Sequence, residues 1–469
     1  MKPKLLAITL FIFLNIHCNP KVTSVTARDP LSISTQKSTL TPFSVDELER
    51  RTFNWFWDLI DKNYQVPDRT PTLQFSSIAA TGFGLTAYCI GVERQYVTRS
   101  QAAERVKKTL DVLWKLPQGE GKTGVSGYKG LFYHFLDNDR SERFKEIELS
   151  TIDTGLLMAG VLSVMSYFDQ DNPIENDIRE RADALFRRVE WDWCLNKDKT
   201  QISMGYHPET GFIKQGWAGY NEAMVLVIMA IGSPTHAVPP QCWQEWCKTY
   251  PWATFEGQEH VNFDPLFGHQ YSHMYVDFRG IYDDYMSQKG IDYFENARRA
   301  TLANRSYCVK NPNKYANYNA NEWGLTACDG PKDTTTIFNG KEHKFWGYSA
   351  RGAASTQIVD DGTIAPTAAG GSIPFLPELC LSALENMWNK YNGTLVQKYG
   401  FKDAFNPTYT FGKGNEQGWV DVDYLGIDQG PILIQLENYR SEFVWKLMKK
   451  NPYIVAGLKK AGFRGGWLK

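Results

Sequence analysis

The feature that most constrains the fold is an alternation of two kinds of helix-like segment. One kind is amphipathic, with charged side chains on one side, and covers residues 45–63, 98–115, 174–193, 290–309 and 441–450. The other kind is apolar nearly all round and rich in Gly, Ala and Ser, and covers residues 76–91, 151–168, 221–233, 269–284, 365–384 and 431–440. Helices that are apolar on every side must be buried, so the second set belongs in the interior.

This alternation predicts an all-α domain, an (α/α)6 toroid in which the apolar helices form an inner ring and the amphipathic helices an outer ring. A prior of roughly 150 residues per domain would give about three domains, and two stacked helical domains are the alternative. No Pro/Gly/Ser-rich linker separates two halves of the chain. We therefore predict one domain over residues 44–469. Capping boxes, Ser44 with Glu47 and Thr98 with Gln101, mark two outer helix starts.

Two strand-like hairpins, at residues 131–149 and 202–213, interrupt the helices. Each stands between an amphipathic segment and the next apolar one. We therefore expect the hairpins to surround one mouth of the toroid, at the N-termini of the inner helices.

The N-terminus has the pattern of a secretory signal. Lys2 and Lys4 precede an apolar run, residues 5–14, that is too short to span a bilayer. Cys18 then stands where a bacterial lipoprotein is acylated, although His17 departs from the small residue usual before it. We expect a signal segment over residues 1–18, a flexible tether over 19–43, and an exported protein that is periplasmic or anchored to the outer membrane by lipid. An ordinary secreted protein is the alternative.

Charge and cysteine content exclude several classes of partner and scaffold. The net charge of −1 gives no electrostatic reason to expect nucleic acid or an anionic membrane surface. Apart from Cys18, seven scattered cysteines remain. They do not imply a disulfide framework, and at most one local pair is expected, with Cys242 and Cys247 left open. We expect a monomer.

Carboxylates stand where three of the apolar helices are predicted to start: Glu148 and Asp153, Glu222, and Asp428. In a toroid these starts converge on one cavity, so the carboxylates would face one pocket. Helix N-termini favour negative charge by roughly 0.3–1 kcal/mol, which suits both a structural and a catalytic role. We predict Pro431 at the first position of the third helix, where its missing N–H costs nothing.

Each carboxylate has a structural alternative. Asp153 comes three residues after Ser150, which is typical of a capping box. Asn221 can cap the helix that follows, which leaves Glu222 without a capping duty and next to an apolar run. Desolvation would raise the pKa of Glu222 toward the range that a general acid needs near neutral pH. Asp428 can simply accept N–H bonds at its helix start.

Other motifs are weak. His269 and His273 are spaced as two metal ligands on one helix, but no third ligand accompanies them, and we predict no metal site. The segment "DVDYLGIDQG" lacks the Gly and terminal Glu of a calcium loop. The sequence has no G-x-S-x-G elbow, no G-x-G-x-x-G motif and no Walker loop. We therefore expect no nucleotide or other cofactor.

Several long motifs stand in order along the chain. They are "GHQYSHMYVDFRGIYDD" (268–284), "NEWGLTACDGP" (321–331), "DDGTIAPTAAGGSIPFLPE" (360–378), "YGFKDAFNP" (399–407) and "YLGIDQGPILIQLENYRS" (424–441). Together they resemble the bacterial glycoamylase-like family, which includes the endo-β-1,2-glucanases of glycoside hydrolase family 144. The resemblance runs from about residue 45 to the C-terminus. It implies an inverting hydrolase on an (α/α)6 toroid, without metal or organic cofactor.

The resemblance also implies roles for single residues. Glu222 in "GYNEAM" resembles the general acid of the family, and Asp428 in "GIDQGP" resembles its base-side carboxylate. In relatives that act on this linkage, the base accepts its proton from a substrate hydroxyl, which in turn takes a proton from the attacking water. Asp428 therefore need not touch that water. Asp153 resembles a further acidic residue of the pocket, and Glu148 is assigned to substrate binding.

Further candidates for sugar binding lie near these motifs. The aromatic residues are expected to stack on glucose units, as Trp and Tyr do in sugar sites, although each is more often a core residue. Two polar residues are expected to bind hydroxyls. The set is Trp217, Tyr220, Gln270, Trp323, Trp346, Arg351 and Trp419.

Three functions compete at this stage. The first is an inverting hydrolase of β-1,2-glucan, either an endo-β-1,2-glucanase or an exo enzyme that releases sophorose. The second keeps the fold but cleaves another glucan linkage, as in a glucoamylase. The third is a non-catalytic glycan-binding lipoprotein, against which the paired carboxylates at 222 and 428 argue, because a binder does not need both.

Overall fold

The computed structural model describes residues 41–469, of which Pro42–Lys469 form one compact unit. The predicted signal segment, Cys18 and nearly all of the predicted tether lie outside the described residues. Among residues 41–469, no helix combines the length and the apolarity needed to cross a lipid bilayer.

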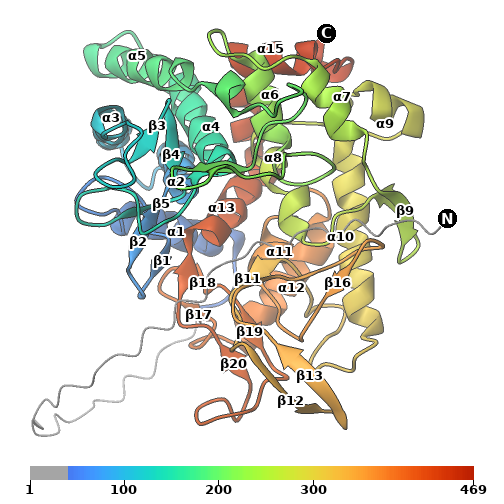
Figure 1. Cartoon of the computed structure of the whole chain (residues 1–469). Coiled ribbons are helices and arrows are strands. Elements are labelled where there is room, and N and C mark those ends of the chain that lie inside the picture. Colours follow the sequence, from blue (N-terminus) through green and yellow to red (C-terminus); the bar gives the residue numbers. More distant parts are fainter. Residues whose placement is uncertain (1–40) are drawn as a thin grey trace, which may run out of the picture. The chain divides into compact units, whose positions relative to one another are not determined.

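The unit is mostly helical, with short strands (Figure 1). The α-helices of the described residues are α1 (Val45–Asp58), α2 (Ile78–Glu93), α3 (Arg99–Lys115), α4 (Thr151–Tyr167), α5 (Pro173–Arg187), α6 (Met224–Gly232), α7 (Gln241–Cys247), α8 (Tyr271–Tyr275), α9 (Asp284–Lys289), α10 (Tyr293–Lys310), α11 (Pro366–Gly370), α12 (Pro377–Lys390), α13 (Gly426–Ser441), α14 (Phe443–Met448) and α15 (Pro452–Lys460). Short 3-10 turns cover Trp191–Cys194, Leu266–His269 and Gly466–Leu468.

The apolar helices contact one another in sequence order. Helix α2 packs on α4, α4 on α6, α6 on α8, α11 on α13, and α13 returns to α2. Gln270, just before α8, donates a hydrogen bond to the carbonyl of Ala368 in α11, which supplies the contact between those two helices. The amphipathic helices cover this series from outside, with α1 on α2 and α13, α5 on α4, α12 on α11 and α15 on α6.

Burial separates the two kinds of helix as predicted. Every residue from Ile78 to Gly91 in α2 is buried, and so is every residue of α6. Helix α1 buries one face only. Two large apolar clusters fill the unit, and α13 joins them, because Leu433 faces one cluster and Ile432 faces the other. All seven cysteines of the described residues are buried and unpaired, so Cys242 and Cys247 do not form a disulfide.

Two predicted inner helices differ from expectation. The segment 269–284 does not form one helix. Its α-helix α8 ends at Tyr275, because the chain becomes extended at Val276 and the Asp277 side chain accepts the backbone N–H of Arg279 in a tight turn, and α9 begins only at Asp284. The segment 365–384 divides into α11 and α12. Pro377 stands at the start of α12, where a proline is tolerated, and the helix before it has already ended.

The prediction for Pro431 is wrong. Helix α13 begins at Gly426, so Pro431 lies inside it. A proline has no N–H to donate to the carbonyl four residues earlier, which here belongs to Ile427. The Tyr271 hydroxyl of α8 donates to that carbonyl instead, at 3.2 Å. The helix therefore continues through Pro431 because a neighbouring helix supplies the missing donor.

Of the two capping boxes, one forms. Thr98 and Gln101 exchange both hydrogen bonds. Ser44 accepts the N–H of Glu47, but the Glu47 side chain bonds to Arg51, at 2.6 Å, instead of turning back to the cap.

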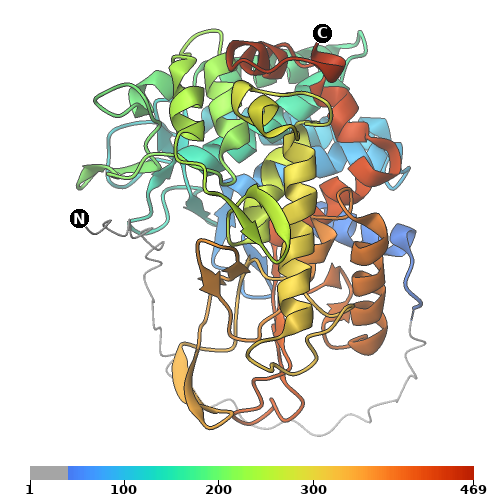
Figure 2. The same ribbon diagram turned by 90° about the vertical axis from the view of Figure 1, so that its right-hand side faces the viewer.

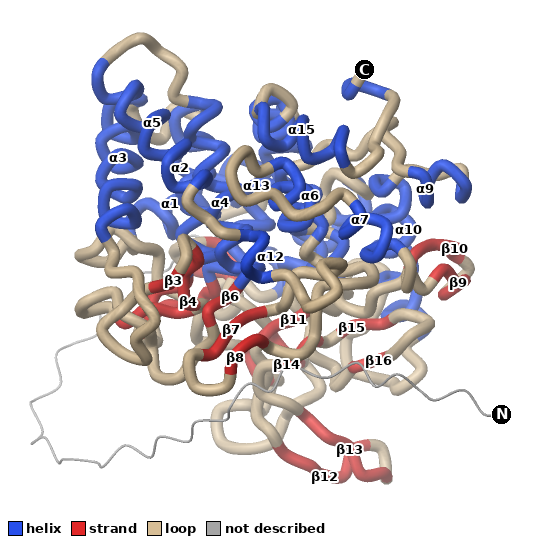
Figure 3. Tube along the Cα trace, turned by 45° about the horizontal axis from the view of Figure 1, so that its top comes forward, coloured by secondary structure: helices blue, strands red, loops and turns tan. Residues whose placement is uncertain are grey.

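Short strands gather at one end of the helices, as Figure 3 shows. They are β1 (Arg69–Thr70), β2 (Phe75–Ser77), β3 (Gly127–Tyr128), β4 (Leu131–Tyr133), β5 (Phe135–Asp137), β6 (Leu149–Ser150), β7 (Gly205–His207), β8 (Gly211–Phe212), β9 (Trp252–Phe255), β10 (Gln258–Val261), β11 (Ala327–Cys328), β12 (Thr334–Phe338), β13 (Lys341–Phe345), β14 (Ser349–Ala350), β15 (Gly352–Ala353), β16 (Ile358–Val359), β17 (Val396–Gln397), β18 (Gly400–Phe401), β19 (Phe405–Asn406), β20 (Trp419–Val420) and β21 (Tyr424–Leu425).

The strands pair in antiparallel fashion and lead into the apolar helices. Both predicted hairpin regions contribute to a five-stranded sheet of order β3-β4-β6-β7-β8. Strand β2 runs directly into α2, β6 into α4, and β21 into α13. Strand β1 pairs with β21, with Arg69 opposite Leu425. The β9–β10 hairpin lies against α10, the long helix that faces the viewer in Figure 2. The strands therefore fix where three inner helices start.

Helices α2 and α4 pack backbone to backbone through glycines. A Cβ atom on Gly160 would lie 2.0 Å from the carbonyl oxygen of Gly82, and one on Gly82 would lie 2.4 Å from that of Leu156. The obstacle is backbone, which cannot rotate away as a side chain can. Small residues in the apolar helices are thus needed for this contact.

We expect Gly160→Ala to destabilise the fold. Overpacking a dense core typically costs about 1–3 kcal/mol, and here α4 must move away from α2 to admit one methyl group. Thermal unfolding followed by circular dichroism should show a lower Tm. Gly119→Ala is the matched control, because its added Cβ would meet nothing closer than 3.4 Å. Equal Tm values for the two variants would contradict the proposed role of the contact.

Candidate functional site

Three predicted catalytic carboxylates lie at starts of apolar helices. Asp153 is in the first turn of α4, after strand β6, and Asp428 is in the first turn of α13, after β21. Glu222 lies in the turn that leads into α6, where Asn221 accepts the N–H of Ala223. All three are buried, with 3–7% of their surface exposed. Their carboxyl groups are therefore largely desolvated.

Helix α8 links the segments that carry Glu222 and Asp428. The Ser272 hydroxyl accepts the N–H of Val225, at 3.0 Å, and donates to the carbonyl oxygen of Glu222, at 2.9 Å. Its neighbour Tyr271 donates to Ile427, the residue before Asp428. Two adjacent residues of one short helix therefore bond to the chain on both sides of the site.

The three carboxylates all act on the phenol of Tyr271. Burial raises the pKa of Tyr271 far above its ordinary value, and the charges of Asp428, Glu222 and Asp153 raise it further. Burial also raises the pKa of Glu222 to about 7, with a smaller contribution from the Asp153 carboxylate. Glu222 thus holds its proton up to neutral pH.

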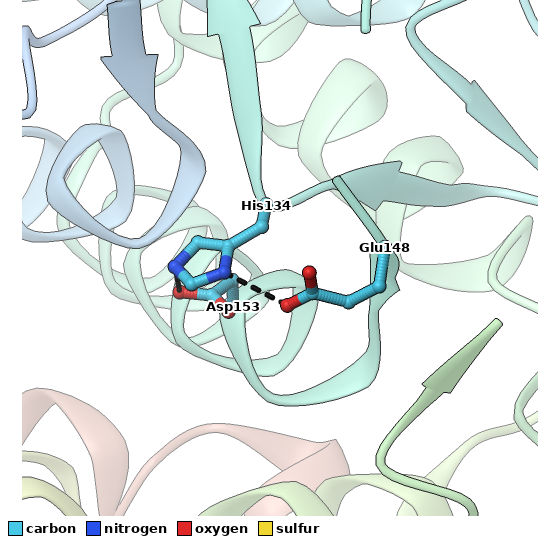
Figure 4. Close-up of side chains that lie close together, drawn as sticks. All are labelled: His134, Glu148 and Asp153. Atoms are coloured by element: carbon cyan, nitrogen blue, oxygen red, sulfur yellow. Dashed lines mark hydrogen bonds and ion pairs between the residues drawn. The ribbon is translucent and has the colours of Figure 1, made fainter. Parts of the chain in front are cut away.

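His134 joins two of the acidic residues, as Figure 4 shows. Its Nδ1 lies 2.8 Å from Glu148 Oε1, and its Nε2 lies 3.4 Å from Asp153 Oδ1. Burial lowers the pKa of His134, but the charges of Asp153 and Glu148 outweigh it and raise that pKa to about 9. Burial in turn raises the pKa of Asp153 and the imidazolium opposes it, while for Glu148 the imidazolium outweighs burial and lowers the pKa.

Ser150 caps α4 as predicted. Its hydroxyl accepts the N–H of Asp153 at 3.2 Å and lies 2.5 Å from Asp153 Oδ2. Asp153 therefore takes part in a cap and also contacts His134, so its structural and its catalytic interpretation do not exclude each other.

A second acidic cluster surrounds Asp428. Asp403 accepts the N–H of Asp329, at 2.7 Å, and Arg69 donates to Asp329 Oδ2, at 2.5 Å. One carboxylate oxygen each of Asp403, Asp421 and Asp428 is buried without a hydrogen-bond partner among the described residues. Burial raises the pKa of both Asp428 and Asp403, and their neighbouring negative charges raise that of Asp403 well above its ordinary range. Asp403 therefore takes up a proton first and stabilises the ionised form of Asp428.

The described residues contain two groups whose ligand atoms lie within 4.8 Å of one another and which could hold a metal ion. They are His134 with Glu148 and Asp153, and Asp329 with Asp403 and Asp421. His269 and His273 belong to neither group. Burial lowers the pKa of both imidazoles, and His269 Nε2 faces the carbonyl oxygen of Phe263 at 3.2 Å.

Five of the predicted sugar-binding residues are buried in the fold. Trp217 donates its indole N–H to Thr151 at the start of α4, at 2.9 Å. Gln270 bonds to α11. Tyr220 stacks at a tilt on His269, and Trp323 is fully buried.

Arg351 is also fully buried, and its role is to hold the backbone beside the site. Its guanidinium makes two bonds to Asp361, at 2.7 and 2.8 Å, and one to the carbonyl of Cys328, the residue before Asp329. Trp346 and Trp419 are only half-buried. These two remain candidates for stacking on a sugar.

Sequence reasoning missed His134, Asp329, Asp403, Arg69 and Tyr271. Asp329 and Asp403 stand in the motifs "CDGP" and "GFKDAFNP", so a signal was present but pointed to no role. His134 carries no motif. Its place beside Glu148 depends on the pairing of β4 with β6, where Tyr133 lies opposite Leu149.

Comparison with known proteins places this site in a family. A family model described as "putative glucoamylase" matches residues 214–452. A putative glucoamylase from Bacteroides uniformis has a similar structure, with a TM-score of 0.78 and 31% identity over 92% of this chain and 100% of that one. An endo-β-1,2-glucanase from Chitinophaga pinensis, solved with sophorotriose and glucose, has a TM-score of 0.77 and 29% identity over 91% of this chain and 100% of that one.

A curated relative is similar over most of this chain. It is an exo β-1,2-glucooligosaccharide sophorohydrolase, acting at the non-reducing end, from Parabacteroides distasonis. The two are 27% identical over an alignment of 453 positions, and the alignment covers 89% of this chain. The chain spans 57% of the length of that relative. The matched family model and the full-length structural match at 31% identity together establish that the chain belongs to the glycoamylase family.

Proposed function

We propose that the protein is an inverting glycoside hydrolase that cleaves β-1,2-glucan, with Glu222 as the general acid and Asp428 as the base-side carboxylate. The helices that contact one another from α2 to α13 would form the inner ring of an (α/α)6 toroid, with the active site at their N-terminal mouth. The activities of the Chitinophaga and Parabacteroides relatives support the β-1,2 linkage.

The observation that carries the proposal is the linkage of two buried carboxyl groups through α8. An inverting enzyme needs an acid on one side of the scissile bond and a base on the other, with the carboxyl groups about 6.5–9.5 Å apart so that a water fits between them. Glu222 and Asp428 come from distant parts of the sequence, and the bonds of Ser272 and Tyr271 hold their segments to one helix.

The two carboxyl groups are prepared for opposite tasks. Glu222, with its pKa raised to about 7 by burial, is protonated and can give its proton to the leaving oxygen. Asp428 must be ionised to accept one. Asp403 would support this by taking up a proton before Asp428 does, because the pKa of Asp403 is raised well above its ordinary range, whereas burial raises that of Asp428 to about 7.

Glucan hydrolysis should be measured directly, with linear β-1,2-glucan as the substrate and the chain length of the products as the readout. We expect hydrolysis without added metal and no loss of rate with EDTA, because the nitrogens of His134 already face carboxylates and Arg69 already binds Asp329. A ladder of products would indicate endo action, and sophorose alone would indicate exo action.

Other outcomes would change the proposal. Activity on starch with none on β-1,2-glucan would favour a glucoamylase-like enzyme. Binding of glucan with no hydrolysis would favour a glycan-binding protein. Loss of activity with EDTA that is restored by one metal ion would place that ion at one of the two acidic groups.

A further inference from the structure

His134 occupies an unusual position for a histidine that no motif marks. It lies between β4 and β5, and its backbone N–H donates to the carbonyl of Glu148 at 3.1 Å, while its own carbonyl accepts the N–H of Ile78, the first residue of α2. Its ring packs face to face on Phe135, with centroids 3.9 Å apart. Backbone and ring are thus both fixed, and the two ring nitrogens point at Glu148 and Asp153.

Both nitrogens of His134 face carboxylate oxygens. A neutral imidazole has one donor and one acceptor nitrogen, so one of the two contacts would set a lone pair against a carboxylate. An imidazolium has two donors and suits both contacts. The geometry therefore favours a charged ring at this buried position, with its charge balanced by the two carboxylates that it touches.

We propose that His134 is a positioning residue that holds Asp153 as an oriented carboxylate beside Glu222, and so keeps the general acid protonated at the pH of catalysis. This inference rests on the proposed function, in which Glu222 is that acid. Ser150 fixes the second oxygen of Asp153, so His134 and Ser150 together orient the group. Asp153 then presents its negative charge to Glu222 without freedom to turn away.

Other charges around His134 come from two further segments. Asp68, just before β1, acts on the imidazole in the same direction as Asp153 and Glu148. His207 of β7 faces Glu148 and opposes its negative charge. Apart from burial and its own backbone, the one neighbour that shifts the pKa of Glu222 is Asp153. His134 therefore affects Glu222 through Asp153.

The direction in which the pKa of Glu222 should shift when His134 is replaced follows from these contacts. Without the imidazolium, Glu148 and Asp153 are buried together with no counter-charge, and Asp153 takes up a proton more readily. A neutral Asp153 no longer disfavours the ionised form of Glu222, so the pKa of Glu222 falls. Activity that needs protonated Glu222 is then lost at lower pH than in the unmodified protein.

The test is the pH profile of kcat/KM for His134→Gln, Asp153→Asn and the double variant. We expect the alkaline limb to move to lower pH by on the order of one unit in His134→Gln, which is the size of effect that one nearby charge has at an effective dielectric constant of about 20. Asp153→Asn should move the limb in the same direction. In the Asp153→Asn background, His134→Gln should add no further shift.

His236→Gln is the matched control, because His236 also lies beside an aspartate, Asp192, with 3.2 Å between Nδ1 and Oδ1, but in a loop beyond the far end of α6. It should leave the limb in place. An unmoved limb in folded His134→Gln, or equal shifts with and without Asp153, would overturn the inference. If Glu222→Gln kept near-native turnover in the same assay, the proposed function itself would fail, so the two failures are distinguishable.

A second measurement does not depend on the folding of a variant. In the unmodified protein, histidine side-chain NMR with 15N labelling should report a ring at position 134 that stays protonated at both nitrogens at pH 7.5. The His134 resonance can be assigned because it is absent from the spectrum of His134→Gln. If that variant does not fold, the resonance can be assigned by its change of chemical shift in Asp153→Asn. A neutral His134 ring at that pH would overturn the proposal.

Discussion

Glu222→Gln should lose about 10²–10⁴-fold in turnover, the usual contribution of general acid–base catalysis. The substitution keeps the shape of the side chain and removes the proton that Glu222 would give to the leaving oxygen. Its Tm should change little or rise, because an amide in this buried position no longer requires desolvation of a carboxylate. Turnover on β-1,2-glucan and thermal unfolding, measured on one preparation, test both expectations.

Glu245→Gln provides the control for this substitution. Glu245 belongs to α7, and its side chain pairs with the exposed Lys248, the residue that follows this helix. Its loss should leave turnover unchanged. If Glu222→Gln retained turnover within a few-fold of the unmodified protein, Glu222 would not be the acid, and the buried carboxyl at the start of α6 would be structural.

Asp428→Asn should lose a comparable factor in turnover, with little change in Tm. Asparagine caps or supports a helix start about as well as aspartate, so a purely structural Asp428 would tolerate the change. A catalytic Asp428 would not, because an amide accepts no proton from the water or from a substrate hydroxyl. Substrate affinity, measured with a sophorose-containing oligosaccharide, should persist, since other contacts to the sugar remain.

Asp284→Asn is the matched control, because Asp284 stands in the first turn of α9 and its charge pairs only with Arg464, at the surface. Near-native turnover in Asp428→Asn would remove Asp428 from the mechanism. A collapse in rate together with a large drop in Tm would mean that the variant reports on folding, and the affinity measurement would then show whether the site still forms.

Much of the helical pattern could be predicted from the sequence because local composition decides it. A segment such as 76–91 has no polar face, so it is buried wherever it lies, and the structure buries it entirely from Ile78 to Gly91. The position of Asp153 at a helix start could also be predicted from the sequence, because Ser150 and Asp153 form a local capping pattern, and the structure contains this cap.

The contacts that could not be predicted from the sequence depend on pairing between distant segments. His134 meets Asp153 only because β4 lies beside β6, and Asp403 meets Asp428 only because the chain around 400 returns to the start of α13. The complete burial of Trp323 and Arg351 also depends on packing between distant segments. Both stand in motifs near the site, but whether a side chain faces the pocket or the core follows from packing that no local pattern records.

Helix α8 has a consequence for how the site moves. Tyr271 and Ser272 are adjacent residues, and each donates a hydrogen bond to a backbone carbonyl beside one of the two carboxyl groups. We therefore expect a displacement of α8 to carry the segments of Asp428 and Glu222 together. Pro431 cannot donate to the carbonyl of Ile427, so the bond from Tyr271 does not compete with a bond inside α13. The segments of the proposed acid and base are thus tied to one short helix instead of to two separate ones.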